Sequence, residues 1–201
     1  MKDVIIIGAG GHARVIADIV RCRGDRCLGF LDDFAQDGVG DIPVLGTIKD
    51  YVNYPNASFI VGIGNAAVRR KVVRSMEGVR WYTAIHPAAV VSELNVSIGP
   101  GTAVMAGAII NTGAVIGAHA IINTAAVVEH DNRIGDFVHI SVGAKLAGTV
   151  TVGPDSWVGI GAVVSNNLSI CGGCMIGAGA VVIRSIGEPG TYVGVPAGRT
   201  V

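Results

Sequence analysis

The sequence predicts a small domain of alternating strands and helices, followed by a parallel β-helix. Two periodicities in the 201-residue chain predict these folds. From residue 98 onward an aliphatic side chain recurs at every sixth position, whereas residues 1–84 alternate between short apolar runs and stretches with helical spacing. We therefore expect one domain at residues 1–84 and a second at residues 85–201, the latter ending in a non-repetitive tail.

The β-helix is predicted by the six-residue repeat, because side chains repeat every 3.6 residues in an α-helix and every two in a strand. A period of six indicates a short strand and a turn, and three such units close one triangular coil. Four positions after each aliphatic residue the side chain is mostly small, as at Ala108, Ala144 and Ala162, which lets the corner close. The aliphatic positions are Ile98, Val104, Ile110, Ile116, Ile122, Val128, Ile134, Ile140, Leu146, Val152, Val158, Val164, Ile170, Ile176 and Val182.

The first domain is predicted to be a small parallel α/β fold. Apolar runs at 4–10, 27–33 and 58–64 indicate strands, and helical spacing predicts helices at 11–24, 47–55 and 65–77. Strands that alternate with helices favour a parallel sheet.

Composition and charge exclude several classes of partner. Fifteen basic and fifteen acidic residues balance, so neither a nucleic acid nor an acidic membrane surface is favoured. The uncharged stretch 94–128 contains recurring Asn, Thr and His, and acidic residues flank it, which argues against a membrane span. The N-terminal residues lack the features of a signal peptide, so we expect a cytoplasmic protein with free thiols. Cys171-x-x-Cys174 lies inside the repeat without a second ligand pair, so no metal site is expected.

The first strand ends in Gly8-Ala9-Gly10-Gly11-His12-Ala13, which fits the G-x-G-x-x-G/A pattern, and Asp32 and Asp33 end the next strand. A helix that begins at such a turn offers backbone N–H groups to a phosphate. About 84 residues make only half of a dinucleotide-binding fold, so a mononucleotide or a nucleotide-sugar diphosphate is favoured. A tight turn that binds nothing is the alternative. Gly62-Ile63-Gly64-Asn65 ends the third strand at the same sheet edge and is either part of this site or a simple turn.

Glu129-His130-Asp131 is a cluster of charge within the repeats. A carboxylate beside a histidine can fix its tautomer and raise its basicity, as a general base requires. An exposed charged corner is the alternative. His139, half a coil further on, is either a site residue or a packed histidine. His119 is expected to be structural, and His86 to belong to the junction between the domains.

These motifs occur in an order that resembles one group of proteins. GAGGHA, FLDDF, GIGN, NTAAVVEHD, IGDFVHISVGAKLAG and VGVPAGR together are similar to bacterial nucleotide-sugar acetyltransferases of the bacillosamine type, with sialic acid O-acetyltransferases as relatives. The resemblance covers almost the whole chain. It implies a left-handed β-helix, acetyl-CoA as co-substrate and an N-terminal domain that holds the nucleotide of a UDP-linked 4-amino sugar. It also implies a homotrimer, which the flat, aliphatic walls independently favour.

The resemblance also implies roles for individual residues. His130 would be the general base, and Asp131, where the bacillosamine enzymes have Glu, would raise its basicity. Ala35 stands where those enzymes have Lys, which bears on the choice of nucleotide sugar. The residues implied to contact the UDP-sugar are Gly10, Gly11, His12, Asp32, Asp33 and Gly64, and those implied along the acetyl-CoA site are His139, Ile160 and Ala178. We further expect the backbone N–H of Gly148 to stabilise an oxyanion.

The expected activity is therefore acetyl-CoA-dependent acetylation of the 4-amino group of a UDP-linked deoxyamino sugar, by direct attack without a metal or a covalent acyl-enzyme. A sialic acid O-acetyltransferase is the alternative enzyme. A nucleotide-binding structural or regulatory protein that kept the β-helix is the alternative from another class.

Overall fold

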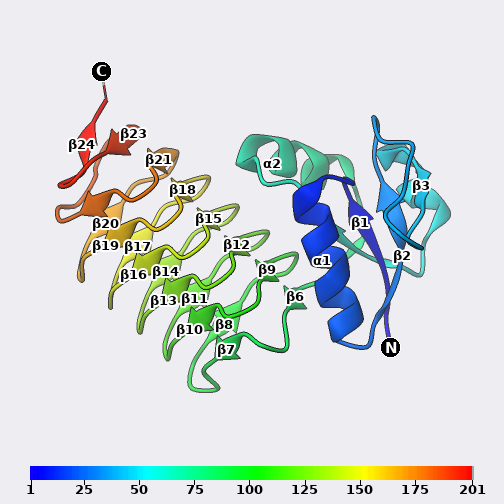
Figure 1. Ribbon diagram of the computed structural model, residues 1–201, viewed down its shortest axis with the longest axis horizontal. Helices are drawn as coiled ribbons and strands as arrows, with labels where there is room; N and C mark the ends of the chain where they lie inside the picture. The colour runs from blue at the N-terminus through cyan, green and yellow to red at the C-terminus, as the bar shows by residue number, and fades with distance from the viewer. Residues whose placement is uncertain (201) are drawn as a thin grey trace. The chain divides into compact units, whose positions relative to one another are not determined.

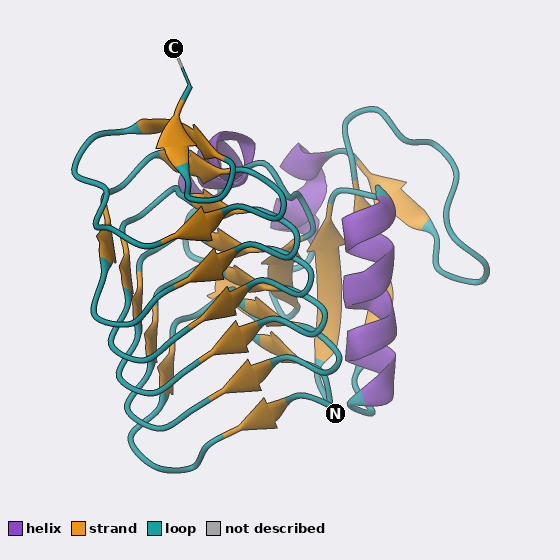
Figure 2. Ribbon diagram, turned by 60° about the vertical axis from the view of Figure 1, so that its left-hand side comes forward, coloured by secondary structure: helices purple, strands orange, loops and turns teal. Residues whose placement is uncertain are grey.

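The computed structural model of the protein describes residues 1–200. The chain folds into two compact units, Met1–Pro87 and Ala88–Val201 (Figures 1 and 2). The first contains a parallel sheet with helices, and the second is a left-handed parallel β-helix, so the fold class predicted from the sequence is confirmed.

The first unit is built on a five-stranded sheet in the order β3-β2-β1-β4-β5, with β1 at its centre. The three strands expected from apolar runs are β1, β2 and β4, whereas β3 and β5 are short edge strands that no apolar run marked. The elements are β1 (Asp3–Ile7), α1 (Gly11–Cys22), β2 (Arg26–Leu31), β3 (Val44–Gly46), the 3-10 helix η1 (Ile48–Asn53), β4 (Ser58–Val61), α2 (Ala66–Ser75), β5 (Arg80–Trp81) and β6 (Ala84–Ile85).

Side chains of β1 alternate between two packed layers. Ile5 and Ile7 are fully buried in a cluster that includes Val72 of α2. Ile6 faces α1 instead, because a Cβ built at Gly62 would lie 3.0 Å from Ile6 Cγ2 and 2.6 Å from the Cβ of Ala13 in α1. Glycine at position 62 therefore lets the first helix pack closely against the end of β4.

The second unit consists of coils with one short strand on each of three walls. Wall 1 is β7 (Val90–Val91), β10 (Ile109–Ile110), β13 (Val127–Val128), β16 (Lys145–Leu146), β19 (Val163–Val164) and β22 (Val181–Val182). Wall 2 is β8 (Ser97–Ile98), β11 (Val115–Ile116), β14 (Arg133–Ile134), β17 (Thr151–Val152) and β20 (Ser169–Ile170). Wall 3 contains β9 (Ala103–Val104), β12 (Ile121–Ile122), β15 (His139–Ile140), β18 (Trp157–Val158), β21 (Cys174–Ile176), β23 (Gly190–Val193) and β24 (Gly198–Arg199).

The six-residue repeat is the structural period of this unit. Each repeated aliphatic residue is the last residue of its strand, and all except Ile98 are buried in the interior. Equivalent strands stack in parallel, so that Ile110 pairs with Val128 and Val128 with Leu146. Many corners contain a residue with positive φ, such as Gly113 (71°) or Asp131 (59°), and this left-handed conformation turns the chain onto the next wall. Among residues 1–200, no helix has the length and apolar character needed to cross a membrane.

Candidate functional site

The loop between β1 and α1 depends on glycine for its conformation. Gly8 has φ of 94°, and a Cβ there would come within 3.0 Å of Ile63 Cγ1, so glycine is needed at this position. Gly10 precedes the first turn of α1, and a Cβ built on Gly10 or Gly11 would meet no protein atom within 4 Å. The backbone of these two glycines is therefore uncovered at the helix N-terminus, where N–H groups of a helix can bind a phosphate.

Asp32 connects this loop to the segment after β2. Its Oδ2 accepts the Ala9 N–H at 2.8 Å, and its Oδ1 accepts the N–H groups of Phe34 (2.8 Å) and Ala35 (2.9 Å). Partial burial raises the pKa of Asp32, but these three hydrogen bonds outweigh it and hold the pKa below its usual value. Asp33 accepts the Ile48 N–H at 2.9 Å and so fixes the start of η1. Both carboxylates shape the loops around the site.

His12 and Arg69 are the polar side chains beneath these loops. Arg69 is 1% exposed, and its Nη1 donates to the carbonyl oxygens of Ile63 (2.8 Å) and Gly64 (2.9 Å). Burial, together with the charge of Arg69, lowers the pKa of His12 to about 4, so His12 is neutral near pH 7. Arg69 thus determines the path of the loop that contains Gly64, a role that the helical spacing of α2 did not reveal.

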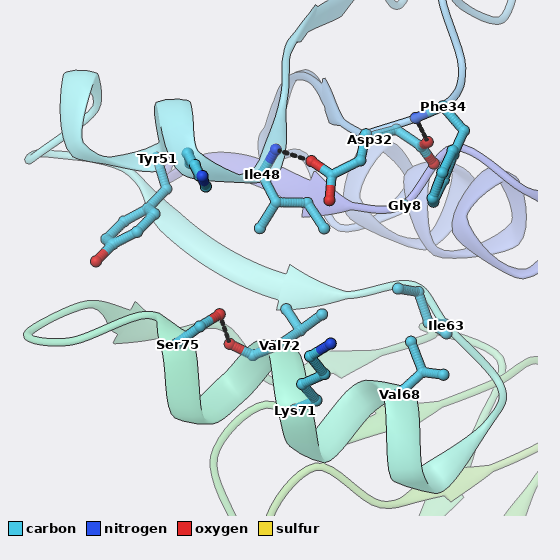
Figure 3. Close-up of a pocket in the computed structure, with 12 residues that line it drawn as sticks. Gly8, Asp32, Phe34, Ile48, Tyr51, Ile63, Val68, Lys71, Val72 and Ser75 are labelled. Atoms are coloured by element: carbon cyan, nitrogen blue, oxygen red, sulfur yellow. Dashed lines mark hydrogen bonds between the residues drawn. The ribbon is translucent and has the colours of Figure 1, made fainter.

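A cavity of about 530 Å³ lies at the carboxyl end of the first unit's sheet (Figure 3). Figure 3 shows Lys71 and Val72 of α2 on one side of it and Ile48 and Tyr51 of η1 on the other. Of the residues proposed to contact the nucleotide sugar, Asp32 and Asp33 line this cavity, whereas Gly10, Gly11, His12 and Gly64 are not in its lining. The lining consists of Gly8, Asp32, Asp33, Phe34, Ile48, Lys49, Tyr51, Ile63, Val68, Lys71, Val72 and Ser75.

Two cationic residues and an aromatic residue of this cavity carry no recognisable signal in the sequence. Lys49 and Lys71 supply positive charge, and Tyr51 supplies a ring against Phe59 of β4, with ring centroids 6.3 Å apart. In the sequence Lys71 belongs to a basic helix face that looks like ordinary solvated surface. Only the folded arrangement shows that this lysine, unlike Arg74 in the same helix, lines the cavity.

In the second unit, His130 and Asp131 form the corner between walls 1 and 2. His130 Nδ1 lies 2.9 Å from Asp131 Oδ2, and about half of the His130 side chain is exposed. A carboxylate at this distance favours the tautomer with a proton on Nδ1, which leaves Nε2 as the acceptor. Glu129 Oε2 accepts the His130 N–H at 3.2 Å and lies outside this pair. The structure therefore brings the two predicted catalytic side chains together.

Asn132 is the buried brace beneath this corner. It occupies the position that is small in most repeats, and its side chain is fully buried. Its Nδ2 donates to the carbonyl oxygens of Glu129 (2.8 Å) and Ala147 (3.1 Å), and its Oδ1 accepts the Val150 N–H at 2.6 Å. Asn132 thus links the His130 corner to the next coil. The departure from the small-residue pattern was the signal for it in the sequence.

Gly148 lies one coil beyond His130, at the same corner. A side chain at position 148 would collide with the His130 ring at Nε2, and one at Gly113, a coil earlier, would collide with Asp131 Oδ1. Glycine on both sides therefore gives His130 and Asp131 room. Gly148 therefore lies beside Nε2, the nitrogen of His130 that is left as the acceptor.

The other residues implied along an acetyl-CoA site lie elsewhere in the coil. His139 is buried on wall 3, where its ring stacks on Trp157 with centroids 4.9 Å apart and its Nε2 lies 3.0 Å from Asn123 Nδ2. Ile160 and Ala178 are exposed at successive turns of the corner between walls 3 and 1, where the Gly179 N–H donates to the Ile160 carbonyl. Within one chain these residues do not meet the His130 corner.

The remaining histidine and cysteine motifs of the β-helix have structural surroundings. His119 is buried against Phe137, with ring centroids 5.2 Å apart. Cys171 Sγ and Cys174 Sγ lie 3.4 Å apart, and Cys174 Sγ approaches the Glu188 carbonyl at 3.6 Å. Burial, with the neighbouring Cys171 thiol, raises the pKa of Cys174 to about 11, so it remains a thiol near pH 7.

Sequence comparisons connect this arrangement with known enzymes. The family model described as the PglD N-terminal domain matches residues 3–76. The chain is 34% identical over 165 residues to GDP-perosamine N-acetyltransferase of Escherichia coli O157:H7, covering 76% of this chain and 73% of that relative. It is 42% identical over 114 residues to UDP-N-acetylbacillosamine N-acetyltransferase of Bacillus subtilis (strain 168), covering 53% of this chain and 52% of the relative, about half its length.

Solved structures agree over the full length. The acetyltransferase domain of PglB from Neisseria gonorrhoeae FA1090, in complex with acetyl coenzyme A, is 36% identical with a TM-score of 0.94 and 99% coverage of both chains. PerB from Caulobacter crescentus, in complex with CoA and GDP-perosamine, is 38% identical with a TM-score of 0.94, covering 100% of this chain and 98% of that one. The chain therefore belongs to the hexapeptide-repeat nucleotide-sugar acetyltransferases, as its motifs predicted.

Proposed function

We propose that the protein transfers an acetyl group from acetyl-CoA to the 4-amino group of a UDP-linked deoxyamino sugar, in the cytoplasm. The observation that carries the proposal is the His130–Asp131 pair, with Nδ1 and Oδ2 at 2.9 Å and Nε2 beside Gly148. The names of the relatives support the general reaction, since they act on nucleotide-linked amino sugars and the related structures hold acetyl-CoA or CoA.

In the proposed reaction the sugar amine attacks the thioester carbonyl carbon directly. His130 Nε2 accepts the proton that the amine loses as its nitrogen–carbon bond forms. Asp131 holds the Nδ1 proton and stabilises the imidazolium that results. The developing oxyanion accepts the Gly148 N–H, and its collapse breaks the carbon–sulfur bond. CoA then leaves as a thiolate that takes up a proton.

The nucleotide is assigned to the first unit. Its diphosphate would accept hydrogen bonds from the open backbone at Gly10 and Gly11, and the base and ribose would occupy the cavity that Asp32 and Asp33 help to form. Lys49 and Lys71 add positive charge at the cavity wall, which favours an anionic ligand.

The acetyl-CoA site is proposed to need more than one copy of the chain. His130 and Gly148 lie at the corner of walls 1 and 2, whereas Ile160 and Ala178 lie at the corner of walls 3 and 1. A homotrimer around an axis along the β-helix would place one kind of corner against the other kind in a neighbouring copy. Exposed apolar side chains such as Val115, Val142 and Val163 support this assembly because they leave apolar surface to cover.

Light scattering tests the proposed trimer. It should give three chains per particle, and a monomer at micromolar concentration would refute the assembly.

A substrate panel tests the activity. Purified protein is incubated with acetyl-CoA and, separately, a UDP-linked 4-amino sugar, a GDP-linked 4-amino sugar and free sialic acid. Release of the CoA thiol and the mass of the product are measured. Acetylation of the UDP-linked sugar supports the proposal, and preference for the GDP-linked sugar corrects its nucleotide. Acetylation of sialic acid alone, or of nothing, supports an O-acetyltransferase or a non-catalytic protein instead.

A glycine variant tests the nucleotide site separately. Gly11→Val should weaken binding of the nucleotide sugar, because its side chain would enter the space proposed for the diphosphate, while its Cβ meets no protein atom within 4 Å. Gly187→Val is the control, since a Cβ there is equally unobstructed. Calorimetry should show weaker nucleotide-sugar binding only for Gly11→Val, with acetyl-CoA binding retained. Unchanged nucleotide-sugar affinity would indicate that the loop is a simple turn.

A further inference from the structure

Asp18, Cys22 and His86 form a cluster of potential metal ligands in the first unit, separate from the cavity and the β1–α1 loop. Asp18 and Cys22 are exposed on α1, and His86 is partly buried just after β6. One ligand atom from each of the three, a carboxylate oxygen, a thiol sulfur and an imidazole nitrogen, lies within 4.8 Å of the other two. The proposed acetyl transfer uses none of them.

Local structure explains why these three side chains meet. Asp18 and Cys22 are four residues apart in α1, so they lie on the same helix face one turn apart. Arg23, at the end of α1, donates from Nη1 to the Ile85 carbonyl at 3.0 Å and thereby holds the residue before His86 against the helix. His86 is distant in sequence, and for this reason ligand spacing alone gave no sign of the cluster.

Two guanidinium groups lie near the cluster, and each has a partner outside it. Arg21, next to Cys22, directs its guanidinium to Asp41, with Nη2 and Oδ1 at 2.7 Å. The Arg23 guanidinium is held by the Ile85 carbonyl. A deprotonated Cys22 and an ionised Asp18 would supply two negative charges, and neutral His86 would add none. A divalent cation would therefore be balanced in charge.

We propose that Asp18, Cys22 and His86 bind a zinc ion. Thiolate, imidazole and carboxylate are the three ligand types that Zn²⁺ takes in proteins, whereas Mg²⁺ and Ca²⁺ prefer oxygen ligands alone. Zinc–ligand bonds of about 2.0–2.3 Å place the ligand atoms of a tetrahedron roughly 3.3–3.8 Å apart, so small side-chain rotations from the present arrangement suffice. Water supplies the fourth ligand, because the cluster is exposed.

The ion would fix the C-terminal part of the helix whose N-terminus begins the proposed diphosphate site. It connects α1 to the segment after β6, and the site is complete within Met1–Pro87. Its role is therefore stabilisation of the first unit, and the chemistry at His130 does not depend on it. At a free zinc concentration about 100 times Kd, the melting temperature should rise by roughly 5–10 °C.

Zinc binding is measured with the full-length chain in a Cys171→Ser background, because the Cys171–Cys174 pair offers two further thiols. After incubation with Zn²⁺ and desalting, elemental analysis should find about one zinc per chain. Adding Cys22→Ser should abolish retention and the rise in melting temperature. Cys27→Ser, which removes a first-unit thiol outside the cluster, should leave both unchanged. Equal zinc retention with and without Cys22→Ser would overturn the proposal, as would a parent protein that retains none.

Cobalt identifies the ligands directly. Addition of Co²⁺ should produce a thiolate-to-cobalt charge-transfer band and visible bands of tetrahedral intensity, which Cys22→Ser removes and His86→Ala weakens or shifts. Circular dichroism of each variant without metal establishes that it is folded. Cobalt bands that persist in a folded Cys22→Ser variant would show that the metal binds elsewhere. Acetyl transfer is not the readout, so failure here leaves the proposed reaction untouched.

Discussion

The two units of the chain differ in how their candidate site residues are related to the sequence pattern. In the β-helix a six-residue period places an aliphatic residue, buried at every position except Ile98, at the end of each repeated strand. The candidate active site lies at a corner where charged residues stand between two such strands. In the α/β unit no single period exists, and the candidate site is assembled from the ends of three strands and the face of α2. In a periodic structure, a candidate site can therefore be recognised in the sequence as charged residues within an aliphatic repeat. In the α/β unit, the residues of the candidate site are brought together only by the fold, so the sequence pattern does not identify them.

The largest effect that tests this comparison is expected at His130. His130→Ala removes the proposed base and should lower kcat by about 10²–10⁴-fold, while both substrates still bind. Asp131→Asn should lower kcat less, because the imidazole remains but loses its carboxylate. Asn166→Ala is the matched control, since it occupies the equivalent position of the coil two turns further on. Steady-state kinetics measures kcat, and calorimetry measures the binding of each substrate. A near-normal kcat for His130→Ala would mean that Glu129-His130-Asp131 is only an exposed charged corner.

Substitution of Asn132, the buried brace beneath the His130 corner, should have the next largest effect. Asn132→Ala leaves the Val150 N–H and the Glu129 and Ala147 carbonyls without their side-chain partner. Unsatisfied buried polar groups typically destabilise by about 1–3 kcal/mol, and the free energy of unfolding should fall by that order. Because the corner loosens, kcat should fall as well. Ala126→Ser is the control at the equivalent position one repeat earlier. Urea unfolding of Asn132→Ala that matches the parent protein would contradict the role of brace.

The same contrast explains how much of the molecule was predictable. Hexapeptide stepping predicted the β-helix and the burial of residues such as Val128 and Leu146, because one local rule repeats in every coil. The pairing of His130 with Asp131 was predictable because the two are adjacent in sequence. The edge strands β3 and β5 were missed because they are too short to show a pattern. Lys71 and Arg69 were missed because helical spacing does not tell which basic residue is buried and which lines a cavity.

In the α/β unit, the next largest effect is expected at Lys71, which lines the cavity. Lys71→Ala should weaken binding of the nucleotide sugar by roughly 10-fold, the order expected when a charge-assisted contact of about 1.5 kcal/mol is lost. Arg74→Ala removes a cation from the same helix but outside the cavity, and should leave affinity unchanged. Titration calorimetry at low and high salt measures the difference. Equal losses for the two variants would indicate a general effect of charge, with no specific contact at Lys71.

The smallest expected effect is a pH dependence of stability that arises from His12. Its pKa is lowered to about 4 in the folded protein, through burial and the charge of Arg69, whereas an unfolded histidine titrates near about 6.5. Between these values the unfolded chain binds a proton that the folded protein does not. His12 therefore stabilises the fold least at low pH, and its contribution is lost as pH falls from about 6.5 towards 4. Between about pH 7 and pH 5.5 the loss should be about 1 kcal/mol.

Urea unfolding across this interval, with the parent protein and His12→Gln, measures the contribution. The variant cannot take up the proton, so its stability should change less with pH, although its absolute stability differs. If the parent and His12→Gln lose stability in parallel below pH 6.5, then His12 is protonated as easily in the folded protein as in the unfolded chain. In that case the loop above Arg69 is more open to water than the folded arrangement indicates.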